Sequence, residues 1–282
     1  MITLKKKILF LVLSFIASVG MGFSHQTNAA GFNTLDQIKK NGKIRIGVFS
    51  DKPPFGYVDS NGKNQGYDVY LAKRLGKDLF GDENKVEFVL VEAASRSEFL
   101  LSDKVDIILA NFTKTPERAE KVDFAKPYMK VSLGIVSPDN AKITSIDQLK
   151  GKKLIVNKGT TAEIYFTKNY PDIKLLKYDQ NTETFNALLD GRGAALAHDN
   201  TLVFAWATQN KGFTVGINSI GDHDMIAPAV AKGNTTLLNW INDEITKLDK
   251  ERFFHADYEA TLKPIYGDKV DPESVVIEGD TH

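Results

Sequence analysis

The chain contains no cysteine among its 282 residues. This absence excludes disulfide bonds, a thiol nucleophile and a zinc site built on cysteine. It also removes the residue that would carry a lipid at a processing site. We therefore expect a protein that is not lipid-anchored.

Long apolar runs are confined to the N-terminus. Three lysines at positions 5–7 precede an almost purely apolar segment, Ile8 to Phe23, and a short polar stretch ends in alanines at 29 and 30. This order of features predicts a cleaved secretory signal peptide over residues 1–30. The alternative is a membrane anchor, but the apolar segment is shorter than the roughly 20 residues that a spanning helix needs. We therefore expect a periplasmic location.

An excess of either charge is also lacking, because the chain has 36 basic and 36 acidic residues. Without the three leader lysines, 33 basic residues stand against 36 acidic ones. The basic stripe that favours nucleic-acid binding is missing, so no nucleic-acid partner is expected. The sequence also lacks GxSxG, a phosphate-binding glycine loop and a histidine pair at metal spacing. No catalytic residue, cofactor or metal is therefore expected.

Strand-like and helix-like patterns alternate along the rest of the chain. A helical stripe of apolar residues between 69 and 79 is one example of the periodicity that separates the strands. Such alternation favours an α/β fold with mainly parallel sheets flanked by helices. The predicted strands are Arg45–Val48, Val86–Val91, Val105–Leu109, Leu154–Asn157, Lys174–Lys177 and Ala194–His198.

Two segments look alike and suggest two lobes built on the same plan. Thr34 with Gln37, and Ser145 with Gln148, each form the pattern of a capping box before a short helix, a basic turn and a strand. Chance similarity between such short segments is the alternative. The polar tail that begins at Tyr266 is expected to be a peripheral extension.

The strand predicted at Val105–Leu109 is followed by Asn111, Thr113 and, a short distance later, Arg118. Amide and hydroxyl donors with a planar guanidinium can hold a small carboxylate. Ligands in open α/β sheets bind beyond the carboxyl ends of the strands, which supports this interpretation. The alternative for Arg118 is a solvated surface arginine that pairs with a neighbouring acidic residue.

A second strand end leads into a helix that opens with Thr160 and Thr161. Free backbone amides at a helix N-terminus form an anion site. The alternative is a capping box between Thr160 and Glu163, and the two interpretations are compatible.

A third strand end carries His198 and Asp199. The Asp199 carboxylate could hold an ammonium group or could cap the following helix. His198 could face a ligand or could be a hydrogen-bonded core residue. Lys52 and Arg96 lie in or near strand-end loops, where surface charges are also common, and Phe49 either walls a pocket or packs.

Several short segments follow one another in a fixed order: Arg45–Val48 with Pro53–Phe55, Gly66–Val69, Val105–Ile108, Thr113–Arg118, Phe124–Tyr128 and Lys158–Thr161. Their order and spacing resemble the family-3 periplasmic solute-binding proteins, which deliver polar amino acids to ABC importers. The resemblance implies a type II periplasmic binding protein fold, with two α/β lobes and two crossover strands that form a hinge. It implies a first lobe from residues 31–130 and 227–282, including the tail, and a second lobe from residues 131–226.

The resemblance also implies a role for each candidate residue. The ammonium of an amino acid would be accepted by Asp199 with the carbonyl of Asn111 or Ala110. Four residues would hold the α-carboxylate: Arg118, Thr113, Thr160 and Thr161. Four residues fall where relatives contact the ligand side chain: Lys52, Arg96, Asn157 and His198.

The favoured ligand is cysteine or cystine, because the segments 49–57, 91–94, 111–113 and 197–201 are similar to those of cysteine-binding members. The aromatic residues that sandwich basic ligands are missing at Lys52 and near Ala93. An aspartate or glutamate receptor is the alternative within the family, since Arg96 matches an arginine of those relatives. The resemblance implies a monomer that works with an ABC permease in the inner membrane.

Two further hypotheses differ in class. Some relatives are cyclohexadienyl dehydratases, whose chemistry needs a general acid over the ring. Only His198 and Asp199 are candidates for that role, so the sequence favours a binding protein over an enzyme. An added surface role as an adhesin or antigen would leave no signature in the sequence.

Overall fold

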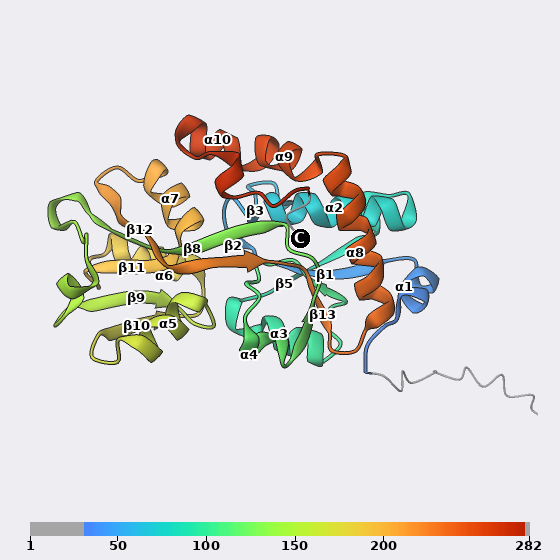
Figure 1. The fold of residues 1–282 in the computed structure, drawn as a ribbon, viewed down its shortest axis with the longest axis horizontal. Coiled ribbons are helices and arrows are strands. Elements are labelled where there is room, and N and C mark those ends of the chain that lie inside the picture. The colour runs from blue at the N-terminus through green and yellow to red at the C-terminus, as the bar shows by residue number, and fades with distance from the viewer. Residues whose placement is uncertain (1–30, 280–282) are drawn as a thin grey trace, which may run out of the picture.

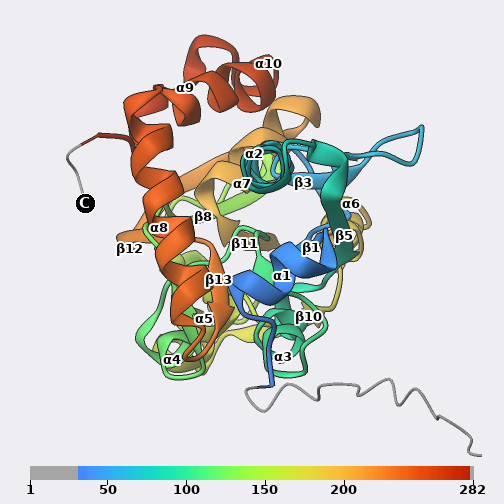
Figure 2. The same cartoon turned by 90° about the vertical axis from the view of Figure 1, so that its right-hand side faces the viewer.

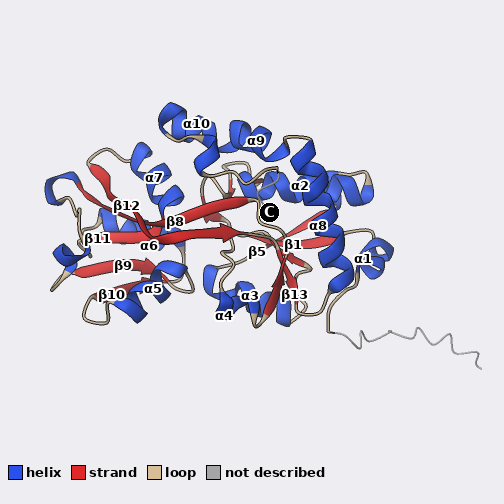
Figure 3. Ribbon diagram, in the orientation of Figure 1, coloured by secondary structure: helices blue, strands red, loops and turns tan. Residues whose placement is uncertain are grey.

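The computed structural model describes residues 31–279, so the predicted signal peptide lies outside the described residues. The molecule is elongated and has two lobes, each with a five-stranded sheet flanked by helices (Figures 1 and 3). This arrangement confirms the predicted α/β class and its two-lobed architecture. Within residues 31–279, no helix combines the length and the apolar character that crossing a membrane requires.

The sheet of the first lobe has the strand order β5-β1-β6-β13-β7. Its core strand β1 (Ile44–Val48) pairs in parallel with β5 (Val86–Leu90) and β6 (Ile107–Ile108). The returning strand β13 (Ala229–Ala231) is antiparallel to β6 and to β7 (Val122–Phe124). The helices of this lobe are α1 (Leu35–Asn41), α2 (Tyr67–Phe80), α3 (Arg96–Leu101), α4 (Pro116–Ala119) and α8 (Thr235–Lys250).

Figure 2 shows α1 and α8 side by side in front of the first sheet, and the two helices contact each other. A small antiparallel sheet in the same lobe leads into α2. Its strands are β2 (Asp51–Lys52), β3 (Gly56–Val58) and β4 (Asn64–Gln65).

The sheet of the second lobe has the order β10-β9-β11-β8-β12. Three strands run parallel: β9 (Lys153–Asn157), β10 (Lys174–Tyr178) and β11 (Ala195–Asp199). Two long antiparallel strands complete the sheet, β8 (Met129–Pro138) and β12 (Phe213–Ile226). The helices are α5 (Thr161–Asn169), α6 (Asn181–Leu189) and α7 (Asn200–Gln209).

The chain passes between the sheets after β7 and again after β12. The strands β8 and β12 pair with each other from the second lobe to the junction with the first, as Figure 1 shows. There Ile226 forms a bridge with Thr113, and the Met225 carbonyl accepts from the Lys114 amide. Register shifts along β12 mark bulges, which let a two-stranded ribbon bend and twist. These strands connect the two lobes.

The predicted strands are present with small differences in their bounds. The strand predicted at Val105–Leu109 is shortest in the structure, because only Ile107 and Ile108 are in regular pairing. The capping box of Thr34 and Gln37 opens α1 as expected. The box of Ser145 and Gln148 is also formed, but it opens a 3-10 turn in place of an α-helix.

Short helical segments complete the fold. After α8 the chain forms α9 (Phe253–Asp257), a π-helical turn at Tyr258–Leu262 and α10 (Lys263–Tyr266). The 3-10 turns are Glu83–Lys85, Ala93–Ser95, Asp139–Ala141, Ile146–Leu149, Gly267–Lys269 and Pro272–Ser274.

The tail beyond Tyr266 is not peripheral, so that prediction was wrong. Tyr266 is buried, and its hydroxyl donates to the Thr201 carbonyl in the second lobe at 2.9 Å. Val276 bridges Met129 at the start of β8. The buried run Val275–Ile277 was overlooked because polar residues surround it and it is too short to show a period. The tail therefore supports the hinge strand from outside.

We predict that Val276→Ala lowers the free energy of unfolding by about 2 kcal/mol, because it removes two buried methyl groups and leaves a cavity. Urea denaturation monitored by circular dichroism measures the change. Ile164→Ala on the exposed face of α5 is the control and should shift stability by less than about 0.5 kcal/mol. Equal effects of the two substitutions would contradict a structural role for the tail.

Candidate functional site

A small cavity lies between the two lobes, at the carboxyl ends of β1, β6, β9 and β11. The space open to the centre of a water molecule is about 10 Å³, so the side chains nearly fill it. Its lining comes from both lobes: Phe49, Lys52, Ala93, Arg96, Asn111, Thr113 and Arg118 from the first, and Thr160, Thr161, His198 and Asp199 from the second. The structure thus brings together ten of the twelve residues singled out in the sequence.

Ala110 and Asn157 are the two candidates outside this lining. The Ala110 carbonyl accepts from Arg96 Nη1 at 2.9 Å. The Asn157 side chain donates to the Asp179 carbonyl at 2.9 Å and accepts from the Thr184 hydroxyl at 2.7 Å. Both ends of the Asn157 amide are therefore committed to the second lobe, which argues against the predicted contact with a ligand.

Lys52 and Asp199 form a buried ion pair between the lobes. The Lys52 ammonium donates to Asp199 Oδ2 at 2.8 Å and to Asn111 Oδ1 at 2.6 Å. Asp199 occupies the N-cap position of α7, but its side chain makes no capping bond within the described chain. The carboxylate instead accepts from Lys52. Asp199 is therefore at the N-cap position, but its charged group does not act as a cap.

The environment of this pair favours the ionised carboxylate. Burial alone would raise the pKa of Asp199, but the charge of Lys52 lowers it by more, and the net shift is downward. Burial lowers the pKa of Lys52, and the attraction of Asp199 opposes that shift without cancelling it. Asp199 is therefore a permanent anion at neutral pH, as an ammonium-binding group must be.

Arg118 is a buried residue, so the alternative of a solvated surface arginine was wrong. Arg118 lies on the short helix α4, and Thr115 caps the N-terminus of that helix. Its Nη1 donates to the Thr113 carbonyl at 2.7 Å, and its Nη2 donates to the Gly159 carbonyl of the second lobe at 2.8 Å. Burial lowers the pKa of Arg118 to about 10, which keeps it charged at neutral pH. Two of its five N–H groups are used, which leaves donors for a carboxylate.

Arg96 is buried and bound mainly to the backbone. It donates to the carbonyls of Ala93, Ala110, Asn111 and Gly159, at 2.9–3.2 Å. Four of its five N–H groups are thus directed at carbonyl oxygens of the described chain. Arg96 therefore braces the cavity wall and contributes its positive charge more than its hydrogen-bond donors.

Phe112 supports both guanidinium groups and was missed in the sequence. The Arg96 and Arg118 guanidinium carbons lie 4.4 and 4.8 Å from the centre of its ring. Cation–π contacts of this kind orient a planar cation and are strengthened by burial. A phenylalanine between Asn111 and Thr113 looked like ordinary core, and only the packing reveals its role.

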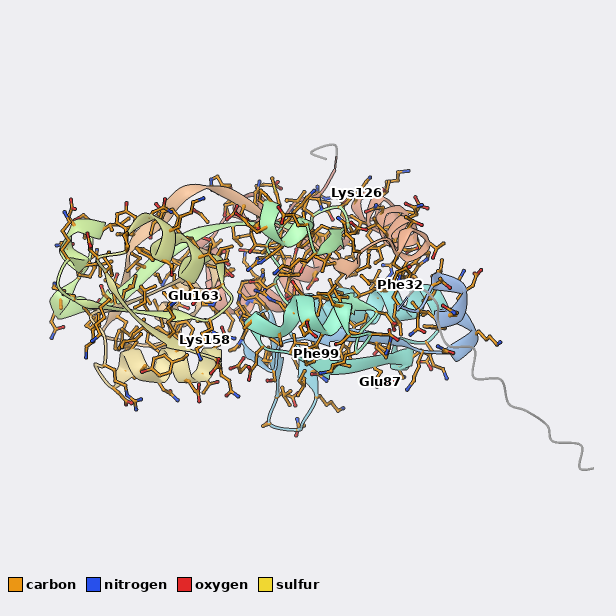
Figure 4. All side chains as sticks on the ribbon, turned by 90° about the horizontal axis from the view of Figure 1, so that it is seen from below. Phe32, Glu87, Phe99, Lys126, Lys158 and Glu163 are labelled. Atoms are coloured by element: carbon orange, nitrogen blue, oxygen red, sulfur yellow. The ribbon has the colours of Figure 1, made fainter. Side chains whose placement is uncertain are left out.

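The loop before α5 lies against the first lobe. Gly159 has φ of +73°, and a Cβ there would lie 2.4 Å from Ala94 Cα. The Glu163 carboxylate accepts from the Gly159 amide at 2.7 Å, while the Thr160 hydroxyl accepts from the Glu163 amide. Figure 4 shows Lys158 and Glu163 at the edge of the second lobe that faces the first.

This capping pattern leaves the α5 amides next to the cavity available. The first N–H groups of a helix have no partner within the helix, and they attract anions. Thr160 and Thr161 line the cavity, so the first turn of α5 is placed to bind a carboxylate. The capping and anion-binding interpretations of this segment therefore hold together.

His198 offers a buried donor to the cavity. Its Nδ1 accepts from the Asp199 amide at 2.7 Å, so the proton of the neutral ring is on Nε2. The distance from Nδ1 to Asp199 Oδ2 is 3.6 Å, too long for a hydrogen bond. Nε2 finds no partner among residues 31–279, and neither does Asn111 Nδ2. Buried donors without a partner are costly, so both favour a bound ligand.

The sequence model of the bacterial extracellular solute-binding proteins, family 3, matches residues 44–260. The glutamine-binding protein of an ABC transporter of Bacillus subtilis is 32% identical over 233 residues, which are 82% of this chain and 85% of that protein.

Two solved structures share both the fold and much of the sequence. A solute receptor for L-cysteine of Neisseria gonorrhoeae is 63% identical, with a TM-score of 0.86 over 87% of this chain and 100% of that one. A cysteine-binding protein from Campylobacter jejuni is 64% identical, with a TM-score of 0.86 over 87% of this chain and 99% of that one.

The burial of His198 generates a prediction on stability. Burial and the nearby Lys52 charge lower its pKa below the ordinary value of 6.5. Below pH 6.5, His198 binds a proton in the unfolded chain but stays neutral in the folded chain. The free energy of unfolding therefore falls as the pH falls below 6.5. The expected slope from this residue is about 1.4 kcal/mol per pH unit.

His198→Gln should remove this component while the rest of the profile remains. Urea denaturation of both proteins between pH 5 and pH 8 measures it. The difference in unfolding free energy between the two proteins should be constant above pH 7 and should change below pH 6.5. A constant difference over the whole range would show that His198 titrates normally.

Proposed function

Because this chain belongs to the bacterial extracellular solute-binding proteins, family 3, we propose that it is the L-cysteine receptor of an ABC importer. The observation that carries the proposal is the cavity between the lobes, where Arg118 and Asp199 offer opposite charges at separate strand ends. A free α-amino acid presents the complementary pair of charges. The names of the two relatives at 63% and 64% identity support cysteine as the ligand.

Each part of the amino acid has a counterpart in the lining. Arg118 and the first amides of α5 bind the α-carboxylate. Asp199 accepts the ammonium. The side chain points toward Lys52, His198 and Asn111. The small cavity and the commitment of Arg96 to carbonyl groups support a short side chain over a second carboxylate.

The remaining proposals concern the setting of the receptor. The signal peptide is removed near residue 30, and the mature monomer works in the periplasm with a permease in the inner membrane. The ligand is released unchanged, without turnover. Cell fractionation tests the location and would also detect exposure at the cell surface. Mass spectrometry of the exported protein tests the cleavage, and chromatography of the ligand after incubation tests for turnover.

Calorimetry with a panel of amino acids tests the function. We expect L-cysteine to bind more tightly than L-cystine, L-aspartate, L-glutamate, L-glutamine and L-arginine. Arg118→Ala should weaken cysteine binding by about 100-fold or more, because a buried charge-assisted pair is lost. Arg192→Ala, at an exposed arginine of the second lobe, should leave affinity unchanged. Tight binding of cysteine by the Arg118 variant would refute the site.

Closure of the lobes around the ligand involves a contact outside the cavity. The Asp51 carboxylate of β2 accepts from Asn181 Nδ2 at 2.9 Å and from the Thr182 amide at 3.0 Å, at the start of α6. The N-cap of α6, Gln180, makes no side-chain capping bond in the part of the chain that is described. A carboxylate of the first lobe thus caps a helix of the second and favours the closed form.

We predict that Asp51→Ala weakens cysteine binding by about fivefold, although Asp51 lies outside the cavity lining. The loss of the cap disfavours closure by about 1 kcal/mol, and the effect should appear mainly as faster dissociation. Stopped-flow fluorescence gives both rate constants. Glu183→Gln, an exposed change in the same turn of α6, is the matched control. A slower association rate with unchanged dissociation would contradict the role of Asp51 in closure.

A further inference from the structure

The part of the cavity left for the ligand side chain presents donors. It is formed by Lys52, Asn111 and His198, with the positive charge of Arg96 beside them. The inference that follows rests on the proposed function, because it concerns the state in which cysteine occupies this part of the cavity.

Asn111 is fixed in one orientation by its neighbour. The Lys52 ammonium can only donate, so the oxygen of the Asn111 amide must face it, at 2.6 Å. The Nδ2 group therefore points the other way and finds no partner among the described residues. The backbone helps to fix this geometry, since the Asn111 amide donates to Asp68 Oδ2 at 2.7 Å.

His198 is fixed in the same manner. Its Nδ1 is occupied by the Asp199 amide, so Nε2 carries the proton and is a donor. Lys52 has a third N–H beyond those directed at Asn111 and Asp199. The hydroxyls of Thr113 and Thr161 also line the cavity and can donate as well as accept. A ligand atom that binds in this part of the cavity should therefore be a hydrogen-bond acceptor with several lone pairs.

The charges around the cavity lead to the same requirement. Lys52 on β2, Arg96 on α3 and Arg118 on α4 are cations in its lining, and Asp199 on β11 is the carboxylate there. His198 is neutral, and Asp68 on α2 adds a carboxylate behind Asn111. A zwitterionic ligand would leave this buried cluster with one uncompensated positive charge. A ligand that carries one net negative charge would neutralise it.

We infer that the receptor binds cysteine as its thiolate, a net monoanion, with the sulfur accepting from His198 Nε2, Asn111 Nδ2 and Lys52. The S–H bond breaks heterolytically, its electron pair stays on sulfur, and the proton leaves to the solvent. No bond to the protein forms and nothing is oxidised or reduced. The hydroxyl of serine has the same shape but does not ionise at neutral pH, so serine should bind far more weakly.

Proton release during binding tests this inference. Titration calorimetry of the wild-type protein with L-cysteine, at pH 7 in buffers of different ionisation enthalpy, counts the protons released. We expect about one proton per cysteine, because the thiol has a pKa near 8.5 and is mostly protonated at pH 7. The affinity should then rise about tenfold per pH unit between pH 6 and pH 8.

L-Serine and L-alanine are the control ligands, because they lack a group that ionises in this range. They report any proton exchanged by the protein itself, such as by Asp68, whose pKa burial raises to about 6. Lys52→Met should flatten the rise in affinity with pH, whereas Lys63→Met in the exposed turn after β3 should retain it.

The outcomes separate the two proposals. Tight cysteine binding with pH-independent affinity and no released proton would overturn the thiolate inference and leave the receptor function intact. Absence of cysteine binding at every pH would overturn both. The measurements on the wild-type protein decide the question even if Lys52→Met does not fold.

Discussion

The closed arrangement of the two lobes depends on the buried pair between Lys52 and Asp199. Each charge comes from a different lobe, and their side chains are only 2% and 5% exposed. A buried charge without a partner costs several kcal/mol, so neither group is tolerated in the interior unless the lobes bring the other to it. The pair therefore links the ionisation state of the site to lobe closure. Lys52 holds Asp199 ionised before any ligand is bound.

Backbone carbonyls organise the side of the cavity that Arg96 and Arg118 line. Arg96 and Arg118 both donate to the Gly159 carbonyl, and both lie against the Phe112 ring. This holds the loop before α5 against the first lobe, where a Cβ at position 159 would not fit. Two cations side by side repel each other, and that repulsion is reduced when a carboxylate joins them. The protein thus fixes the positions of the two guanidinium groups by itself. An anion bound beside them would lower their electrostatic energy.

The sequence allowed the strands and their carboxyl ends to be located, because apolar runs and helical stripes are local signals. Arg118, Thr160 and Asp199 were found through those ends. Lys52 was also singled out, but its pairing with Asp199 was not predicted, because the two residues are 147 positions apart and no local pattern links them. Asn157 was assigned to the ligand by resemblance, because it falls where relatives contact the ligand side chain, but the direction of its side chain depends on Thr184 and Asp179. Contacts to carbonyl groups, which decide the role of Arg96, leave no trace in the sequence.

The same contacts bear on specificity. A pocket that rejects a competitor by size alone gains little between cysteine and serine, which differ by one atom. A pocket of fixed donors with an excess of positive charge favours an ionised acceptor over a neutral hydroxyl, which is itself a donor. His198 Nε2 and Asn111 Nδ2 are such donors, because their other ring and amide atoms are already bonded. Selection of the ligand by the charge of its side chain does not require a large cavity, which agrees with the small space between the lobes.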